Sequence, residues 1–99
     1  MVEIRRSSVY IKWLKKLKDR IGKALIAERI SRLQGGNPGV TKSVGGNVSE
    51  LIIDYGPGYR VYYTRRGKEI IILLCGGNKS TQQEDIEKAK RIAKLYKEE

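Results

Sequence analysis

Histidine is absent from this chain of 99 residues, and cysteine, methionine and tryptophan occur once each. Without histidine there can be no histidine-ligated zinc site, no Ser-His-Asp triad and no Cys-His pair. The lone Cys75 excludes a disulfide within the chain, and its place inside an apolar run indicates a small buried hydrophobe. Acid–base chemistry would have to use Lys, Arg, Tyr, Asp or Glu, and we expect neither a metal nor a cofactor.

Long apolar segments are also missing. No run approaches the length that crosses a bilayer, and the N-terminus lacks the apolar stretch of a secretory signal peptide. We therefore expect a cytoplasmic protein that does not enter a membrane. The length, with 39% hydrophobic and 32% charged residues, predicts one folded domain over residues 1–99.

Acidic residues are few, with 11 against 21 lysines and arginines, and the formal net charge is +10. Such a balance favours a polyanionic partner, meaning RNA, DNA, the ribosome or an acidic protein. The excess of positive charge lies in residues 1–68, while residues 69–99 carry equal numbers of acidic and basic side chains. We therefore expect a polyanion to contact the first two thirds of the chain.

The spacing of apolar residues, caps and turns predicts a strand, two helices, three or four strands and a final helix. The expected ranges are 2–5 for the first strand, 7–18 and 19–34 for the helices, 40–44, 48–54, 59–64 and 69–75 for the later strands, and 82–97 for the last helix. Helices and strands are grouped rather than alternating. This order predicts an α+β fold in which one mainly antiparallel sheet packs against an N-terminal helical hairpin and a C-terminal helix.

Several local details follow from the same patterns. Val9 is expected on the apolar stripe of the first helix, and Arg29 on the basic surface of the second. Gly76 and Gly77 are expected to begin a loop. Thr81 and Glu84 have the spacing of a capping box at the start of the last helix.

Residues 54–63, with the sequence DYGPGYRVYY, hold four of the six tyrosines and a Gly-Pro-Gly turn. In a strand after this turn, Tyr59 and Tyr63 point to one face and Arg60 and Tyr62 to the other. Core packing accounts for Tyr59 and Tyr63. For Arg60 two interpretations are open, a solvated strand face or a side chain aimed at a phosphate.

Seven segments carry the motifs of a known family. They are Trp13-Leu14-x-x-Leu17-x-Asp19, Arg29-Ile30-x-Arg32-Leu33, Gly36-Asn37-x-Gly39, Val44-Gly45-Gly46, Ser49-Glu50-Leu51, Asp54-Tyr55-Gly56-Pro57-Gly58-Tyr59-Arg60-Val61-Tyr62 and Leu73-Leu74-Cys75-Gly76-Gly77-x-Lys79-Ser80-Thr81-Gln82. In these motifs and in the order of its elements, the chain resembles the RelE/ParE superfamily of type II toxin–antitoxin modules. It is similar in particular to the HigB-like branch of phage-derived addiction module killer proteins.

The resemblance implies a RelE-like fold and a toxin held inactive by a cognate antitoxin, usually a helix-turn-helix, HigA-like protein. The activity it implies is ribosome-dependent cleavage of mRNA without a metal, which inhibits translation and arrests growth. The ParE branch of the same superfamily instead inhibits DNA gyrase without catalysis, because one fold serves several functions. A non-catalytic gyrase inhibitor, or an inactive member that only binds an antitoxin, is therefore the alternative.

Cleaving RNA through its 2′-OH requires a base, an acid and positive charge at the phosphorane-like transition state. The arginine of the Gly-Tyr-Arg signature, Arg60, and the lysine before the last helix, Lys79, are the candidates for that charge. Tyr62 could donate a proton or stack on a base. Glu50 could act as a base or could orient Arg60, and an ordinary exposed strand position is the alternative.

A second set of residues is predicted to bind RNA or the ribosome through phosphates and stacking. The set consists of Lys12, Lys15, Lys16, Lys18, Arg20, Lys23, Lys42 and Tyr55. A solvated helix face is the alternative for the cations of residues 12–23.

Two positions depart from the family pattern. Ile52 follows Ser49-Glu50-Leu51, where the HigB-like branch usually has an arginine. Some ribonucleases of the superfamily also place a tyrosine early in the last helix, where this chain has Gln82 to Asp85. The Ile52 departure supports the interpretation as an inactive, antitoxin-binding member.

Overall fold

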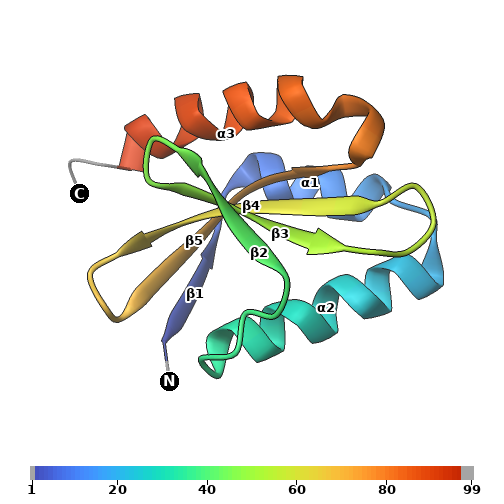
Figure 1. Ribbon diagram of the computed structural model, residues 1–99, viewed down its shortest axis with the longest axis horizontal. Coiled ribbons are helices and arrows are strands. Elements are labelled where there is room, and N and C mark those ends of the chain that lie inside the picture. Colours follow the sequence, from blue (N-terminus) through green and yellow to red (C-terminus); the bar gives the residue numbers. More distant parts are fainter. Residues whose placement is uncertain (1, 97–99) are drawn as a thin grey trace.

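A five-stranded sheet forms the centre of the computed structural model, which describes residues 2–96 (Figure 1). The elements are β1 (Glu3–Arg6), α1 (Ser8–Lys16), α2 (Arg20–Gln34), β2 (Thr41–Gly45), β3 (Val48–Ile53), β4 (Tyr59–Arg66), β5 (Ile70–Gly77), a 3₁₀ turn η1 (Lys79–Thr81) and α3 (Gln82–Tyr96). The strand order is β1-β5-β4-β3-β2, and only the β1–β5 pair is parallel. The predicted α+β fold with a mainly antiparallel sheet is confirmed.

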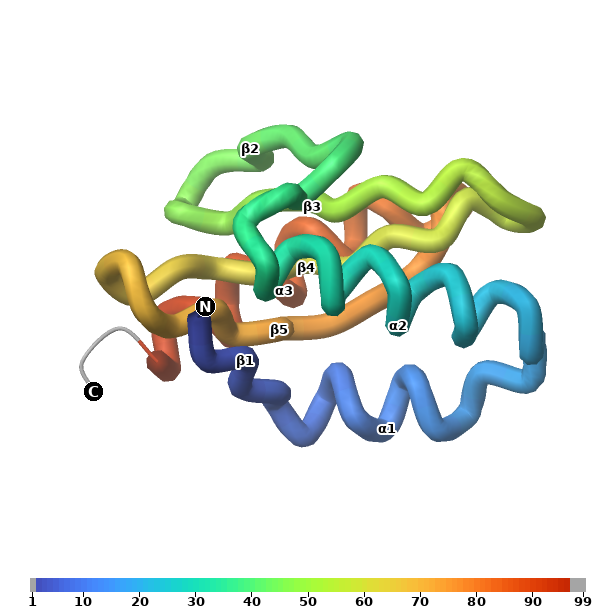
Figure 2. The backbone as a smooth tube through the Cα atoms, turned by 90° about the horizontal axis from the view of Figure 1, so that it is seen from below, coloured from blue at the N-terminus to red at the C-terminus, as the bar shows by residue number. Residues whose placement is uncertain are grey.

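Helices cover both faces of the sheet. Figure 2 shows α1 and α2 together on one side and α3 on the other. Two separate apolar cores result: Tyr59, Val61 and Tyr63 of β4 pack under α1 and α2, whereas Tyr62 packs under α3. The predicted alternation along β4 is therefore present, and Arg60 lies on the α3 face with Tyr62.

β5 is buried on both faces, as its continuous apolar run indicates. Its pairing with β4 shifts register between Tyr62 and Tyr63, which leaves one extra residue on β5. Because of this bulge, Leu74 and Cys75 both belong to the α3 core. Cys75 is 1% exposed, and burial raises the pKa of its thiol to about 12, so it is the small buried hydrophobe that the sequence indicates.

The apolar stripe of α1 begins one residue later than predicted. Ser7 caps the helix by accepting the backbone N–H of Tyr10, and its hydroxyl donates to the carbonyl of Leu74. From that cap, Tyr10 starts an i, i+3, i+4, i+7 series with Trp13, Leu14 and Leu17, all packed on the first core. Val9 is 37% exposed, so its predicted core role is wrong.

Arg29 is not part of a free basic surface, contrary to the prediction. Its guanidinium donates to the carbonyls of Ile52 (2.5 Å), Pro38 (3.0 Å) and Val40 (2.9 Å). Partial burial lowers the pKa of this guanidinium. Arg29 therefore ties the segment before β2 and the end of β3 to α2.

The entry to α3 also differs from the prediction. Gly76 and Gly77, predicted to begin a loop, are instead the last two residues of β5. A Cβ on Gly77 would lie 1.8 Å from the carboxylate of Asp85, so this position requires glycine. Asn78 caps η1 reciprocally with Thr81, whose hydroxyl also donates to Asp85. These contacts replace the predicted Thr81–Glu84 capping box, because a 3₁₀ turn precedes the helix. The predicted helix end at Lys97 lies outside the described residues.

Candidate functional site

One end of the sheet brings together the β3–β4 turn, η1 and the joint between α1 and α2 (Figure 1). Gly58 in that turn has φ of +75°, and a Cβ on it would lie 3.0 Å from Nη1 of Arg60 and 3.3 Å from Cβ of Lys79. The Lys79 N–H donates to the carbonyl of Pro57 at 3.3 Å. The Gly-Pro-Gly turn therefore contacts both the guanidinium of Arg60 and the base of the Lys79 side chain, a close approach that only glycine at position 58 permits.

Arg60 is fixed from three directions. In the sheet it pairs with Ile52 of β3 and Gly77 of β5. Its Nη1 donates to the carbonyl of Gly58 at 2.7 Å, and its side chain is only 11% exposed. Its Nε lies 3.9 Å from Oε2 of Glu50. This restraint favours a guanidinium that holds one orientation toward a ligand.

Glu50 is a fully buried carboxylate on the α3 face of β3. Its Oε2 accepts the hydroxyl of Tyr62 at 2.8 Å and the side-chain amide of Gln82 at 2.8 Å. Lys42 Nζ lies 3.9 Å from Oε1. Since this carboxylate is enclosed by protein groups, its geometry suits an orienting role for Arg60 better than contact with a substrate.

Among residues 2–96, Arg60 Nε and Glu50 Oε1 are buried atoms with no hydrogen-bond partner. Their side chains form an ion pair at 3.9 Å, which is too long for a hydrogen bond. A buried donor without a partner is costly, so such a pair gains when a ligand or a small shift completes its bonds. The observation marks this end of the sheet as the strongest candidate site.

Tyr62 has its hydroxyl directed at Glu50 and not at solvent. Burial, then the hydrogen bond to Glu50 and that group's negative charge, raise the pKa of the phenol above its ordinary range. The arrangement suits a structural donor better than an acid for a leaving group. Tyr55, predicted to bind RNA, is half-buried and packs against the first core.

The predicted RNA-binding cations do not gather around Arg60. Those of residues 12–23 belong to α1, α2 and their joint, which cover the opposite face of the sheet (Figure 2). The joint itself reaches the candidate site, because Asp19 accepts the hydroxyl of Tyr59 at 2.8 Å. Lys18 and Arg20 flank that joint and are exposed. Lys42 is the one predicted cation that contacts the Glu50 cluster.

The family model of the phage-derived Gp49-like proteins matches residues 12–97. An uncharacterized protein of Haemophilus influenzae is 49% identical over 92 residues, which cover 93% of each chain. The chain belongs to the Gp49-like family. This family is of the addiction-module killer type, which points to a toxin paired with an antitoxin.

In this Gp49-like protein, Ile52 lies directly opposite Arg60 in the β3–β4 ladder. The two side chains share the α3 face of the sheet, so an arginine at position 52 would stand beside the guanidinium of Arg60. Ile52 is only partly buried. The departure noted in the sequence therefore falls within the candidate site.

Sequence reasoning did not assign a role to Gln82 or Gly58 in the site. Gln82 begins α3 and donates to the buried Glu50, and Gly58 provides room for Arg60 and Lys79. Both residues lie inside the motifs that match the known family, and this match was the feature of the sequence that could have pointed to them. Among the described residues no group of three or more Cys, Asp or Glu side chains could hold a metal ion, and no helix could span a membrane.

Proposed function

We propose that this Gp49-like protein is the toxin of a type II toxin–antitoxin module, a HigB-like, RelE-type endoribonuclease that cuts mRNA on the ribosome in the cytoplasm. Its whole chain, residues 1–99, would act as one toxin domain. Its partner would be a helix-turn-helix, HigA-like antitoxin. The observation that supports this proposal best is the restrained guanidinium of Arg60 beside Lys79 at the Gly-Pro-Gly turn.

In the proposed reaction, the 2′-oxygen of one nucleotide attacks the adjacent phosphorus, and the 5′-oxygen of the next nucleotide leaves. The 2′-OH loses its proton and the leaving oxygen gains one. Arg60 and Lys79 would stabilise the charge that develops on the phosphoryl oxygens. Removing one such donor costs about 10²–10³ in rate in comparable sites.

Glu50 and Tyr62 would act as positioning residues. The carboxylate of Glu50 would hold Arg60 in its orientation, and Tyr62 with Gln82 would hold the carboxylate. Lys79 lies in η1, and its side chain is exposed. A substrate phosphate would therefore reach Lys79 without any rearrangement of the core.

Mapping of mRNA 5′ ends after a brief induction tests the proposal. The parent and Arg91→Ala, an exposed arginine on α3, should arrest growth and produce new mRNA ends; Arg60→Ala should do neither while still binding the antitoxin. If Arg60→Ala cut as well as the parent, the site would be wrong. DNA-damage signalling with unchanged mRNA would instead identify a ParE-like gyrase inhibitor.

One observation favours a second candidate, an inactive member that only binds its antitoxin. Ile52 occupies the place beside Arg60 where relatives of the HigB-like branch usually have arginine. Under this alternative the parent causes no arrest, and Ile52→Arg restores toxicity and mRNA cleavage. Under the leading proposal the parent is already toxic.

A further inference from the structure

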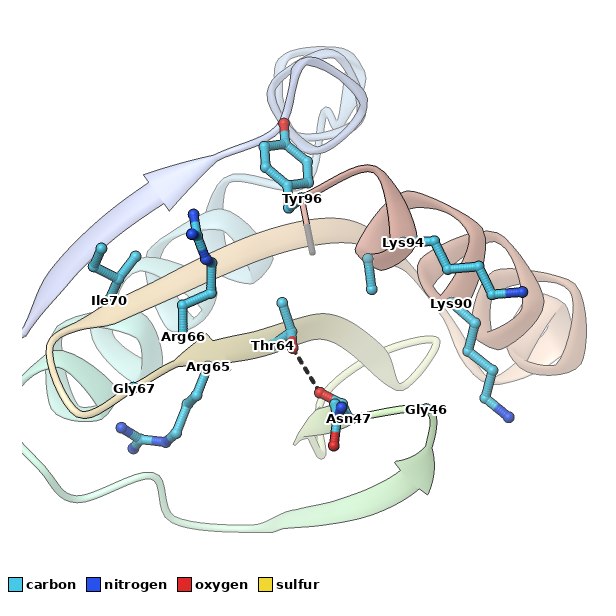
Figure 3. A pocket seen from close by; sticks show the side chains of 11 residues that line it. Gly46, Asn47, Thr64, Arg65, Arg66, Gly67, Ile70, Lys90, Lys94 and Tyr96 are labelled. Atoms are coloured by element: carbon cyan, nitrogen blue, oxygen red, sulfur yellow. Dashed lines mark hydrogen bonds between the residues drawn. The ribbon is translucent and has the colours of Figure 1, made fainter. Parts of the chain in front are cut away.

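A second cationic region lies at the opposite end of the sheet. There the β2–β3 turn, the β4–β5 turn and the last part of α3 surround a pocket of about 630 Å³ (Figure 3). That volume falls within the range of small-ligand sites. Its lining residues are Gly46, Asn47, Thr64, Arg65, Arg66, Gly67, Ile70, Lys90, Ala93, Lys94 and Tyr96. Four of them are basic and none is acidic.

Lys90 is placed in this pocket by the glycines of the β2–β3 turn. A Cβ on Gly45 would lie 3.4 Å from its Nζ, and one on Gly46 would lie 3.4 Å from its Cγ. Both glycines have positive φ, so the turn lies close under the lysine stem. The hydroxyl of Thr64 donates to the carbonyl of Asn47 at 2.7 Å and ties this turn to β4 (Figure 3).

The two lysines of the pocket repel each other. Lys90 and Lys94 are four residues apart on α3, a spacing at which like charges destabilise a helix. Arg65 comes from the end of β4 and lines another side of the pocket, with its guanidinium directed away from the two lysines (Figure 3). None of these three side chains forms an ion pair with an acidic residue within 2–96. A bound anion would relieve this repulsion.

Apolar groups from Ile70, Ala93 and Tyr96 line the same pocket. Tyr96 is half-buried at the end of the second core, with part of its ring open to the pocket. Cations in one pocket with a partly open aromatic ring match a nucleotide, whose phosphate meets the charges and whose base meets the open part of the ring. An inorganic anion would use the charges alone.

The pocket and the Arg60 site lie along the same edge of α3. At the start of α3, Gln82 donates a hydrogen bond to Glu50. Further along the helix, Lys90 lies over the glycines of the β2–β3 turn. Lys42 of β2 lies between these two places, beside Glu50. Thr64 lines the pocket and shares the α3 face of β4 with Arg60, and it is four residues beyond Arg60, which is about 13 Å. A single extended strand of RNA could therefore contact both ends.

We propose that this basic pocket binds phosphates of the RNA chain away from the scissile bond, with a base against Tyr96. The inference rests on the proposed function for its choice of RNA as the ligand. It concerns binding alone and assigns no chemical step to the pocket. The aromatic ring favours a nucleotide over an acidic peptide, whose carboxylates would use the charges alone.

The test measures binding of a 2′-O-methyl oligonucleotide, which cannot be cleaved because it has no free 2′-OH. A length of roughly 16 nucleotides equals the longest stretch of single strand that one binding module covers. Fluorescence anisotropy at several salt concentrations compares Lys90→Gln/Lys94→Gln with Lys88→Gln/Arg91→Gln. Both pairs lie on α3, and both remove two charges; the second pair is exposed and does not line the pocket. Thermal unfolding checks that both variants fold.

Two lost phosphate contacts should reduce the slope of log K against log salt by about 1.4, and the affinity at 0.1 M salt by about 25-fold. The Lys88/Arg91 variant should bind within about twofold of the parent. Equal weakening by both pairs, or none by either, would overturn the inference, as would binding of a Glu-rich peptide in place of the oligonucleotide. Cleavage of mRNA is measured in a separate experiment. If the pocket bound the oligonucleotide specifically but the protein cleaved no mRNA, only the proposed function would be overturned and the inference about the pocket would stand.

Discussion

Replacing Tyr62 by phenylalanine removes one hydroxyl from the Glu50 cluster and leaves the packing of the ring unchanged. The hydroxyl donates to a carboxylate oxygen at 2.8 Å, and both residues are fully buried. A hydrogen bond to a charged group contributes about 1.5–3 kcal/mol. We expect Tyr62→Phe to lower the free energy of unfolding by roughly 2 kcal/mol, since Gln82 and Arg60 still neighbour the carboxylate.

Tyr63→Phe is the matched control. Its hydroxyl lies 3.1 Å from the hydroxyl of Thr41, a neutral partner, and its ring is 4% exposed in the other core. A neutral hydrogen bond contributes about 0.5–1.5 kcal/mol, so this change should cost about half as much. Urea denaturation measures both; with a slope near 2 kcal/mol/M, the midpoint should fall by about 1 M for Tyr62→Phe.

A double-mutant cycle with Glu50→Gln isolates the pair. Once the carboxylate is neutral, Tyr62→Phe should cost clearly less than in the parent, because the strong charge-assisted bond is gone. Growth arrest by Tyr62→Phe would agree with a positioning role, and its complete loss in a stable variant would identify Tyr62 as the acid. Equal costs for the Tyr62 and Tyr63 changes would refute the reasoning.

Three further changes test the fold. Gly77→Ala places a Cβ 1.8 Å from Asp85 Oδ2 and should lower the free energy of unfolding, measured by urea denaturation, by about 1–3 kcal/mol. Gly35→Ala is the control and should be nearly neutral, because its new Cβ stays 3.6 Å from the nearest atom. Ser7→Ala removes a buried helix cap and should cost about 2 kcal/mol by the same assay. A backbone N–H of α2 and then a tyrosine hydroxyl lower the pKa of Asp19. Its contribution to stability is therefore present above about pH 3.9 and lost as pH falls through the lowered pKa, so Asp19→Asn should flatten the urea midpoint between pH 6 and pH 2.5.

The faces of β4 could be predicted from the sequence because its residues alternate strictly between the two cores. The apolar run of β5 has no alternation, and nothing in it indicated the bulge that turns Leu74 and Cys75 to the same side. In α1, Val9 and Tyr10 both fit a helical stripe. The Ser7 cap decided between them, because it sets the rotation of the helix against Leu74.

Charged residues with buried roles were the least predictable. Arg29 was predicted to be a surface residue, and an exposed strand position was one of the two interpretations of Glu50, because both residue types are mostly exposed in proteins. Each is instead held by partners far away in the sequence: three carbonyls for Arg29, and donors from β4 and α3 for Glu50. A pattern along one strand or helix contains no information about such partners. For Arg60, the motif located the residue, and only the fold shows what restrains it.

Charge counted along the sequence differs from charge on a surface. Residues 69–99 carry no net charge, which placed the expected polyanion contact in the first two thirds of the chain. Yet Asp85 is buried against Thr81, while Lys79 lies at one end of α3 and Lys90 and Lys94 lie toward the other. A sum of charges over this segment does not show where in space its cations lie. The last third of the chain therefore provides cations to both the Arg60 site and the pocket beyond it.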